Sequence, residues 1–282
     1  MEPNIPRLKR IAWTIRKDIV DMTTAARSGH PGGSLSAADI MSCLYFHEMK
    51  HDPKNPGWED RDRFVLSKGH ASPALYGTLA AAGYLPREEL KSFRRLGSRL
   101  QGHPERIALP GVEVSTGSLG QGLSVAHGMA LGLRLLGKAS RVYCLVGDGE
   151  VQEGQVWEAV MSAGHFKTAN LCAVIDHNHL QIDGRVEAIK LDPPLPDKFA
   201  AFGWNVISID GHDYDAILEA FGEARRCGDR PTAVVAETVK GKGVSFMEDN
   251  VDFHGKAADD EEYRKAMAEL DAALSEMEAE HE

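Results

Sequence analysis

Two short apolar runs in this sequence end in polar residues that could hold a metal ion. The run at 142–146 leads into Gly147-Asp148-Gly149-Glu150, and the run at 171–175 leads into Asp176-His177-Asn178. Asp148 and Asn178 are 30 residues apart, the length of one strand–helix–strand unit. Because parallel strands joined by a right-handed crossover end at the same edge of a sheet, we expect both side chains to lie there.

The chemistry of this pair favours a hard cation that also takes phosphate oxygens. A carboxylate and a carboxamide supply oxygen ligands with little negative charge, which suits Mg²⁺ or Ca²⁺. The glycines beside Asp148 let the backbone approach a diphosphate, and the following helix points its N-terminus toward the anion. A lone Gly-Asp-Gly is common in ordinary turns. The Asn after the second run makes a metal–diphosphate site a better interpretation than an ordinary turn. The pair does not identify which cofactor carries the diphosphate.

Four histidines lie in loops and border a glycine, namely His30, His70, His103 and His254. Taken singly, a histidine is more often exposed or satisfied within a core. Four in such loops indicate a lined cleft, in which neutral and protonated imidazoles near pH 7 relay protons and hydrogen-bond the hydroxyls of a sugar. We interpret His165 and His212 as structural.

These residues need a scaffold, and the pattern around them predicts an α/β fold. Short apolar strands are expected at 64–66, 142–146, 171–175, 206–209 and 233–236. Helical periodicity or length predicts helices at about 7–27, 73–82, 154–166 and 215–227. A further helix is expected to run from the glycine-rich segment 116–122 to about 136. Ser36 is expected to cap another helix. This alternation predicts a doubly wound, mainly parallel sheet with helices on both faces.

Length and charge limit the other possibilities. We expect 1–282 to be a single domain with an acidic, amphipathic helical tail at 257–282. The net charge of −10 argues against nucleic-acid binding, which needs a basic face. No signal peptide or membrane span is expected, and four cysteines without a CxxC spacing indicate buried thiols in a reducing cytoplasm.

Six segments, taken in order, resemble the N-terminal domain of transketolases. They are SGHPGGSLSAADI (28–40), LSKGHASPALYG (66–77), GHPE (102–105), TGSLGQG (116–122), GDGEVQEGQVWEA (147–159) and DHNHLQIDG (176–184). The resemblance runs from about residue 7 to 255. 1-Deoxyxylulose-phosphate synthases and 2-oxoacid dehydrogenases share the GDG…N element but are less similar at SGHPGG and GHPE. Ser118 departs from the proline that many transketolases carry there.

This resemblance implies the thiamine-diphosphate-binding fold, with thiamine diphosphate held through Mg²⁺, or alternatively Ca²⁺ or Mn²⁺. The implied metal ligands are Asp148, Asn178 and the Leu180 carbonyl. The implied cofactor contacts are His70, Gly117, Leu119, Gly149, Glu153, Asn178 and His254. The implied catalytic residues are His30, His70, His103 and His254, with His30, Arg94 and His103 toward the substrate. Glu153 and Glu158 match acidic residues near a subunit interface, where a proton path is proposed; the alternative is a solvated helix face.

The resemblance also implies an activity and a partner. A transketolase moves a two-carbon ketol unit from a ketose phosphate to an aldose phosphate, as in the pentose phosphate pathway. Nothing after 255 resembles the pyrimidine-binding and C-terminal domains. We therefore expect a separate C-terminal subunit to supply them, in an α2β2 assembly. The alternatives are a split enzyme for an unusual branched or sulfonated ketose, and a non-catalytic thiamine-diphosphate-binding subunit.

Overall fold

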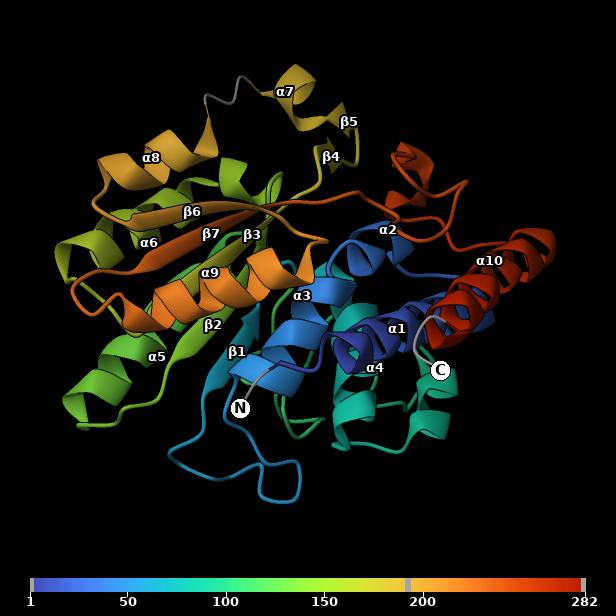
Figure 1. The fold of residues 1–282 in the computed structure, drawn as a ribbon, viewed down its shortest axis with the longest axis horizontal. Coiled ribbons are helices and arrows are strands. Elements are labelled where there is room, and N and C mark those ends of the chain that lie inside the picture. The colour runs from blue at the N-terminus through green and yellow to red at the C-terminus, as the bar shows by residue number, and fades with distance from the viewer. Residues whose placement is uncertain (1–2, 191–193, 280–282) are drawn as a thin grey trace.

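A parallel sheet lies at the centre of the molecule (Figure 1). The computed structural model describes residues 3–190 and 194–279, and within them the sheet has five strands in the order β1-β2-β3-β7-β6. The strands are β1 (Arg63–Leu66), β2 (Val142–Gly147), β3 (Leu171–His177), β6 (Asn205–Asp210) and β7 (Thr232–Glu237). β2 is buried along its whole length and β3 almost so, as expected for apolar strands covered on both faces.

Helices cover both faces of this sheet, so the prediction of a doubly wound α/β fold is confirmed. One hydrophobic core joins the sheet to α1 (Ile5–Ala26), α3 (Ala38–Cys43), α4 (Ser72–Ala82), α9 (Tyr214–Arg226) and α10 (Asp260–Ala279). A second core on the opposite face joins it to α5 (Gln121–Leu135), α6 (Gly154–His165) and α8 (Leu195–Ala201).

Shorter elements complete the described chain. They are α2 (Pro31–Leu35), a π-helical turn (Leu44–Glu48), the hairpin of β4 (Leu180–Gln181) and β5 (Gly184–Arg185), α7 (Val186–Ile189), and 3₁₀ turns at Gly69–Ala71, Arg87–Ser92, Glu150–Gln152 and Val251–His254. The turns at Gly69–Ala71 and Glu150–Gln152 begin three residues after β1 and β2, respectively. They therefore lie at its carboxyl edge, where α/β folds bind ligands.

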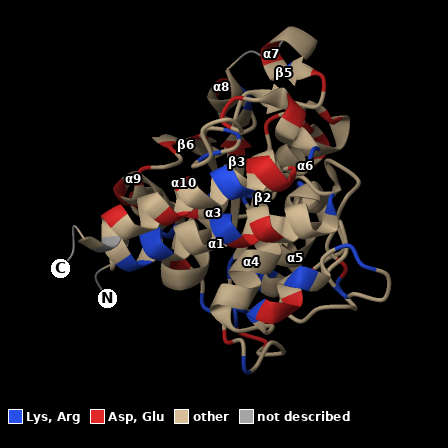
Figure 2. Ribbon diagram, turned by 90° about the vertical axis from the view of Figure 1, so that its right-hand side faces the viewer, with Lys and Arg blue, Asp and Glu red and all other residues tan. Residues whose placement is uncertain are grey.

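The predicted N-terminal and C-terminal helices pack against each other. Asn4 caps α1 by accepting a hydrogen bond from the Arg7 amide. The Tyr263 hydroxyl of α10 donates to Asp21 of α1 at 3.0 Å, and Lys17 forms an ion pair with Asp271. In the view of Figure 2, basic and acidic residues are interspersed along the helices.

Ser36 does not cap the third helix, so that prediction is wrong. Its backbone is helical at the end of α2, and Ala37 stands at the cap position of α3 without a side-chain cap bond. The Ser36 hydroxyl instead donates to Asp176 at 2.7 Å, across the carboxyl edge of the sheet. The segment SGHPGG ends α1 as expected, but its last three residues already begin α2.

Among the described residues, each helix is too short or too polar to span a lipid bilayer.

Candidate active site at the carboxyl edge of the sheet

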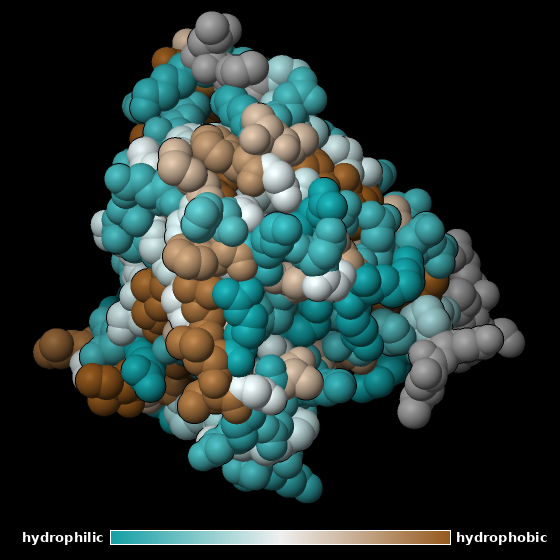
Figure 3. Space-filling model, turned by 90° about the vertical axis from the view of Figure 1, so that its left-hand side faces the viewer, coloured by the Kyte–Doolittle hydropathy of each residue, from teal (hydrophilic) through white to brown (hydrophobic). Residues whose placement is uncertain are grey.

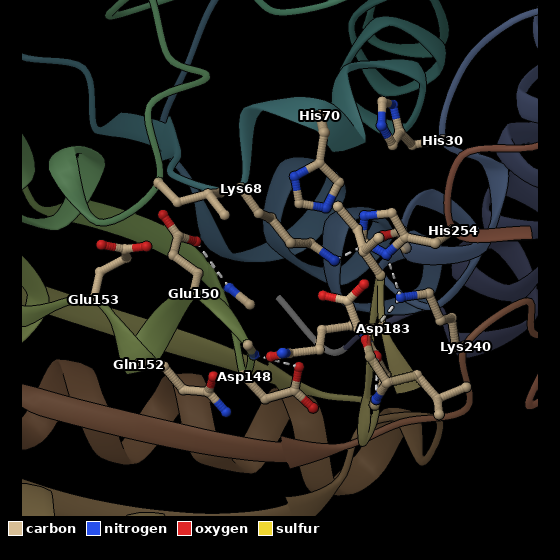
Figure 4. A pocket seen from close by; sticks show the side chains of 18 of the residues that line it. His30, Lys68, His70, Asp148, Glu150, Gln152, Glu153, Asp183, Lys240 and His254 are labelled. Atoms are coloured by element: carbon tan, nitrogen blue, oxygen red, sulfur yellow. Dashed lines mark hydrogen bonds between the residues drawn. The ribbon is translucent and has the colours of Figure 1, made fainter. Parts of the chain in front are cut away.

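A cleft of about 380 Å³ opens at the carboxyl ends of the strands (Figure 4). It brings together nearly all of the predicted site residues. These are His30, His70, His103, Gly117, Leu119, Asp148, Gly149, Glu153, Asn178, Leu180 and His254.

Asp148 follows β2 directly, at the floor of the cleft. Gly147 pairs in parallel with Asp176 of β3, so the two strands end at the same level, as predicted. The buried Asp148 carboxylate accepts hydrogen bonds from the Gly149 amide at 2.7 Å and the His179 amide at 2.5 Å. Burial and the nearby Asp176 charge nevertheless raise the pKa of the Asp148 carboxyl. A cation placed here would offset both effects.

Two further oxygens stand beside Asp148. The Asn178 carbonyl oxygen accepts a hydrogen bond from the Leu180 amide at 3.2 Å, while its amide donates to Asp176 at 3.1 Å. The Leu180 carbonyl accepts from the Lys240 ammonium at 2.7 Å. Since each carbonyl oxygen keeps a second lone pair, the three predicted ligands supply the oxygen chemistry that a hard cation prefers.

Glycines keep this part of the cleft open. A Cβ on Gly149 would lie 2.9 Å from the Gln181 side-chain oxygen, and one on Gly117 would lie 3.0 Å from the His103 ring. Gly117 also has a φ of +150°, which L side chains rarely adopt. Beside it, the buried Thr116 hydroxyl has no hydrogen-bond partner within the described residues.

Sequence reasoning missed an ion pair beneath the cleft. The Lys68 ammonium pairs with Asp176 and donates to the Gly33 carbonyl at 2.7 Å. Asp176 also accepts from Ser36 and from Thr238. Burial alone would raise the pKa of Asp176, but Lys68 and the hydroxyl donors outweigh it and lower the pKa, so the carboxylate is charged.

Lys240 is the second buried cation that sequence reasoning missed. Besides the Leu180 carbonyl, it contacts His254 Nδ1 at 2.8 Å. Burial, together with the Lys68 charge, lowers its pKa to about 8. Lys68 and Lys240 both line the cleft, so their ammonium groups suit an anion such as a diphosphate. The available signal was their position, since each follows an apolar strand by two or three residues.

Glu150 positions three segments around the cleft. Its buried carboxylate accepts from the Ser67 hydroxyl at 2.5 Å, the Gly120 amide at 2.9 Å and the Gly147 amide at 3.0 Å. The ends of β1 and β2 and the glycine-rich loop before α5 are therefore held by one side chain.

The four predicted histidines gather at the other end of the cleft. The His30 ring centroid lies 5.2 Å from that of His70, 5.6 Å from that of His254 and 6.4 Å from that of His103. His70 and His254 stack with centroids 5.2 Å apart. Figure 4 shows His30, His70 and His254 together, with Lys240 bonded to His254.

Burial and nearby cations lower the pKa of each of these imidazoles. Burial, with the Arg94 charge, lowers the pKa of His30 to about 4. Burial, with the Lys240 charge, lowers that of His254 to about 3. The same two causes, burial and a nearby cation, place the His70 pKa well below its usual range and also lower that of His103. At neutral pH all four rings are therefore neutral hydrogen-bonding groups.

The remaining predicted residues lie at the margin of the cleft or outside it. Arg94 lines a neighbouring hollow with Gly102 and His103; it donates to the Ser28 hydroxyl at 3.0 Å and lies 3.5 Å from His30 Nδ1. Glu153 lines the cleft with an exposed side chain. Glu158 is exposed on α6 and is not among the residues that line the cleft.

The sequence and fold of this chain match those of known proteins. Residues 8–275 match the family described as "Transketolase, thiamine diphosphate binding domain". The chain is 45% identical over 264 residues to the 6-deoxy-6-sulfo-D-fructose transketolase subunit SqwG of Clostridium sp. (strain MSTE9), covering 94% of this chain and 96% of that one. It is 40% identical over 266 residues to one of the subunits of the apulose-4-phosphate transketolase of Phocaeicola vulgatus, covering 94% of each.

The fold agrees with these sequence matches. The crystal structure of transketolase from Campylobacter jejuni aligns with a TM-score of 0.89 and 41% identity, over 96% of this chain and 43% of that one. The chain likewise spans 40% of the length of mammalian transketolases that it matches. It therefore belongs to the transketolase family and corresponds to the thiamine diphosphate binding domain of that family.

Proposed function

We propose that this chain is the diphosphate-binding subunit of a two-chain transketolase. The enzyme would move a two-carbon ketol unit from a ketose, such as a ketose phosphate, to an aldose. The observation that carries the proposal is the cleft itself, in which oxygen ligands and two buried lysines at one end face four neutral imidazoles at the other. The near-complete coverage of two relatives that are named as transketolase subunits supports it.

At the strand-end part of the cleft, Mg²⁺ would be held by the Asp148 and Asn178 side chains and the Leu180 carbonyl. The raised pKa of the Asp148 carboxyl supports this, because burial and the Asp176 charge both disfavour the carboxylate and a bound cation would offset both. Ca²⁺ and Mn²⁺ have compatible oxygen chemistry. The diphosphate would bind the metal ion, the Gly149 backbone and the Lys68 and Lys240 ammonium groups.

The remaining cofactor contacts would come from the loops around the cleft. The backbone at Gly117 and Leu119 would lie against the cofactor. His70 and His254 would reach the diphosphate and the reacting carbon, and Glu153 would stand at the cleft margin near the partner. When bound, thiamine diphosphate supplies the nucleophilic carbon and the electron sink that breaking a carbon–carbon bond needs.

The histidines would act on the sugar. His30 and His103, which lie next to Arg94, are placed to hydrogen-bond its hydroxyls and to move protons at them. Their lowered pKa values make them acceptors at neutral pH. The cluster of four imidazoles favours an enzyme over a subunit that only binds cofactor, since cofactor binding needs the metal end alone.

A partner chain would supply the pyrimidine-binding and C-terminal domains, in an α2β2 assembly. Apolar side chains exposed on α5 and α6 or just after them, namely Leu135, Leu136, Met161 and Phe166, offer a surface for a partner. Figure 3 shows a hydrophobic area on one side of the molecule. Glu153 and Glu158 lie at the start and along α6 and would face the same interface. A reducing cytoplasm fits the four unpaired cysteines.

The donor could be an unusual ketose. Both subunit-sized relatives carry the names of uncommon sugars, 6-deoxy-6-sulfo-D-fructose and apulose 4-phosphate. This observation favours a donor outside the common ketose phosphates as the second candidate.

Reconstitution tests the proposal. This chain is purified alone and together with a candidate C-terminal transketolase chain encoded beside it, then assayed with common ketose phosphates, 6-deoxy-6-sulfo-D-fructose and apulose 4-phosphate. We expect two-carbon transfer only with both chains, thiamine diphosphate and Mg²⁺. Strong transfer by this chain alone would refute the two-chain proposal. Cofactor binding by the complex without transfer from any donor would favour the non-catalytic alternative.

A further inference from the structure

Outside the cleft, two imidazoles and two carboxylates converge where β3 and β7 end. His177 is the last residue of β3 and pairs in register with Glu237, the last residue of β7. His179 follows two residues later, and Glu187 comes from the first turn of α7. The four residues thus come from three parts of the chain, and the proposed thiamine diphosphate site uses none of their side chains.

The contacts within this group are those of a ligand set. One ligand atom each from His177, His179 and Glu187 lies within 4.8 Å of the others. The two rings have centroids 4.1 Å apart. A Zn²⁺ ion with nitrogen and oxygen ligands about 2.0–2.2 Å away fits among atoms at this spacing after small side-chain rotations.

Glu237 contacts both imidazole rings. Its two oxygens each lie within hydrogen-bond distance of one ring nitrogen, at 2.6 Å for His177 Nδ1 and 2.8 Å for His179 Nε2. The other ring nitrogen of His179, Nδ1, lies 2.8 Å from Glu187 Oε1. A carboxylate that orients the far side of a metal-binding imidazole is the usual support of such ligands.

We propose that His177, His179 and Glu187 form a second cation site, selective for Zn²⁺ and related transition metals and oriented by Glu237. The two imidazole nitrogens distinguish it from the Asp148 end of the cleft, which offers oxygens and suits Mg²⁺. Two carboxylates also balance the charge of one divalent ion. The four side chains are partly to largely exposed, so an ion reaches them without rearrangement of the core.

An ion bound at this site would connect separate segments of the fold. It ties the ends of β3 and β7 to α7, and the segment between its ligands contains Asn178 and Leu180. If the proposed function is right, occupancy by Zn²⁺ holds the loop that also holds Mg²⁺. The binding of Zn²⁺ itself does not depend on that function.

Titration of tag-free, chelator-treated protein with Zn²⁺ in excess Mg²⁺, followed by competition with a chromogenic chelator, tests the site. We expect one Zn²⁺ per chain that Mg²⁺ does not displace. His177→Asn, His179→Asn and Glu187→Gln should each weaken binding by about 10-fold or more, as losses around a metal ion commonly do. The controls His165→Asn and Glu219→Gln remove an exposed imidazole and an exposed carboxylate elsewhere and should leave affinity unchanged.

A second measurement covers the case in which a variant folds poorly. Hydrogen exchange of the unmodified chain should slow across residues 178–187 when Zn²⁺ is added, and Mg²⁺ alone should not reproduce the pattern. Equal Zn²⁺ affinity in the His177→Asn/His179→Asn double variant, displacement by Mg²⁺, or unchanged exchange in this segment would overturn the proposal. None of these results depends on cofactor binding or ketol transfer, so they leave the proposed function untouched.

Discussion

Two parts of the cleft differ in how they hold ionisable groups. The strand-end part, around Lys68 and Asp176, holds them charged, and the histidine part, around His30 and His254, holds them neutral. At the strand ends, Lys68 and Asp176 are both charged and both buried, and each is paired and hydrogen-bonded. At the other end, His30 and His254 are kept neutral, because burial and nearby cations act against protonation. The first arrangement fixes charge in place for an anion and its metal ion. The second leaves lone pairs free for hydroxyl groups and protons.

The largest effect should follow from breaking the buried pair. Lys68→Met leaves the Asp176 carboxylate buried without its cation, and we expect a loss of about 3–5 kcal/mol in the free energy of unfolding. Urea unfolding monitored by circular dichroism measures it. Lys17→Met removes a partner of the exposed Asp271 instead and should change stability little. Equal stability of the two variants would show that the strand-end charges do not organise the cleft.

The second-largest effect should follow from removal of the proposed anionic metal ligand, Asp148. Asp148→Ala takes away the only charged protein ligand proposed for Mg²⁺, so thiamine diphosphate affinity should fall by about 100-fold, or about 2.7 kcal/mol. Calorimetry on the reconstituted complex with excess Mg²⁺ measures it. Asp183→Ala removes an exposed carboxylate from the same cleft and serves as the matched control. The metal assignment is wrong if both variants bind the cofactor as the unmodified protein does.

A substitution in the histidine part of the cleft should lower turnover without lowering cofactor affinity. His103→Asn removes a hydrogen-bonding group beside His30 and Arg94, which lie on the proposed substrate side. We expect turnover of the reconstituted enzyme to fall by about 10-fold, the value of one or two hydrogen bonds, with cofactor affinity almost unchanged. His165→Asn is the control. Should cofactor affinity fall instead, His103 belongs to the strand-end part.

The smallest effect should be on the pH dependence of stability. The pKa of His30 is about 4 in the folded chain against an ordinary value of 6.5, so the unfolded chain binds more protons between these values. The contribution of neutral His30 is therefore complete above about pH 6.5 and is lost as the pH falls toward about 4. His30→Asn should flatten this part of the profile, measured by urea unfolding across the range. An unchanged slope would mean that His30 is not held neutral by burial.

The elements that position the site could be predicted because their signals are local. The apolar runs that become β2 and β3 are continuous, and parallel pairing then brings Asp148 and Asn178 to one edge without further information. The four glycine-bordered histidines were found in the same way, and the structure places them together.

The rest of the site depends on contacts between distant residues. Lys68 and Asp176 are 108 positions apart, and Ser36 bonds to Asp176 over 140 positions, which is why a local capping rule misassigned Ser36. The acidity of the histidines is likewise invisible in the sequence, since it arises from burial and from the charges of Lys240 and Arg94. Polar residues that follow apolar strands, including lysines, are the signal to use for such networks.

The most direct test of the account is a crystal structure of the reconstituted complex with thiamine diphosphate and Mn²⁺, with the ion located by its anomalous scattering. We expect an Mn²⁺ peak among the Asp148 carboxylate, the Asn178 side-chain oxygen and the Leu180 carbonyl, with the diphosphate bound to the ion and Lys68 and Lys240 alongside. An ion at another position, or a diphosphate bound away from Lys68 and Lys240, would show that the metal and diphosphate assignment is wrong.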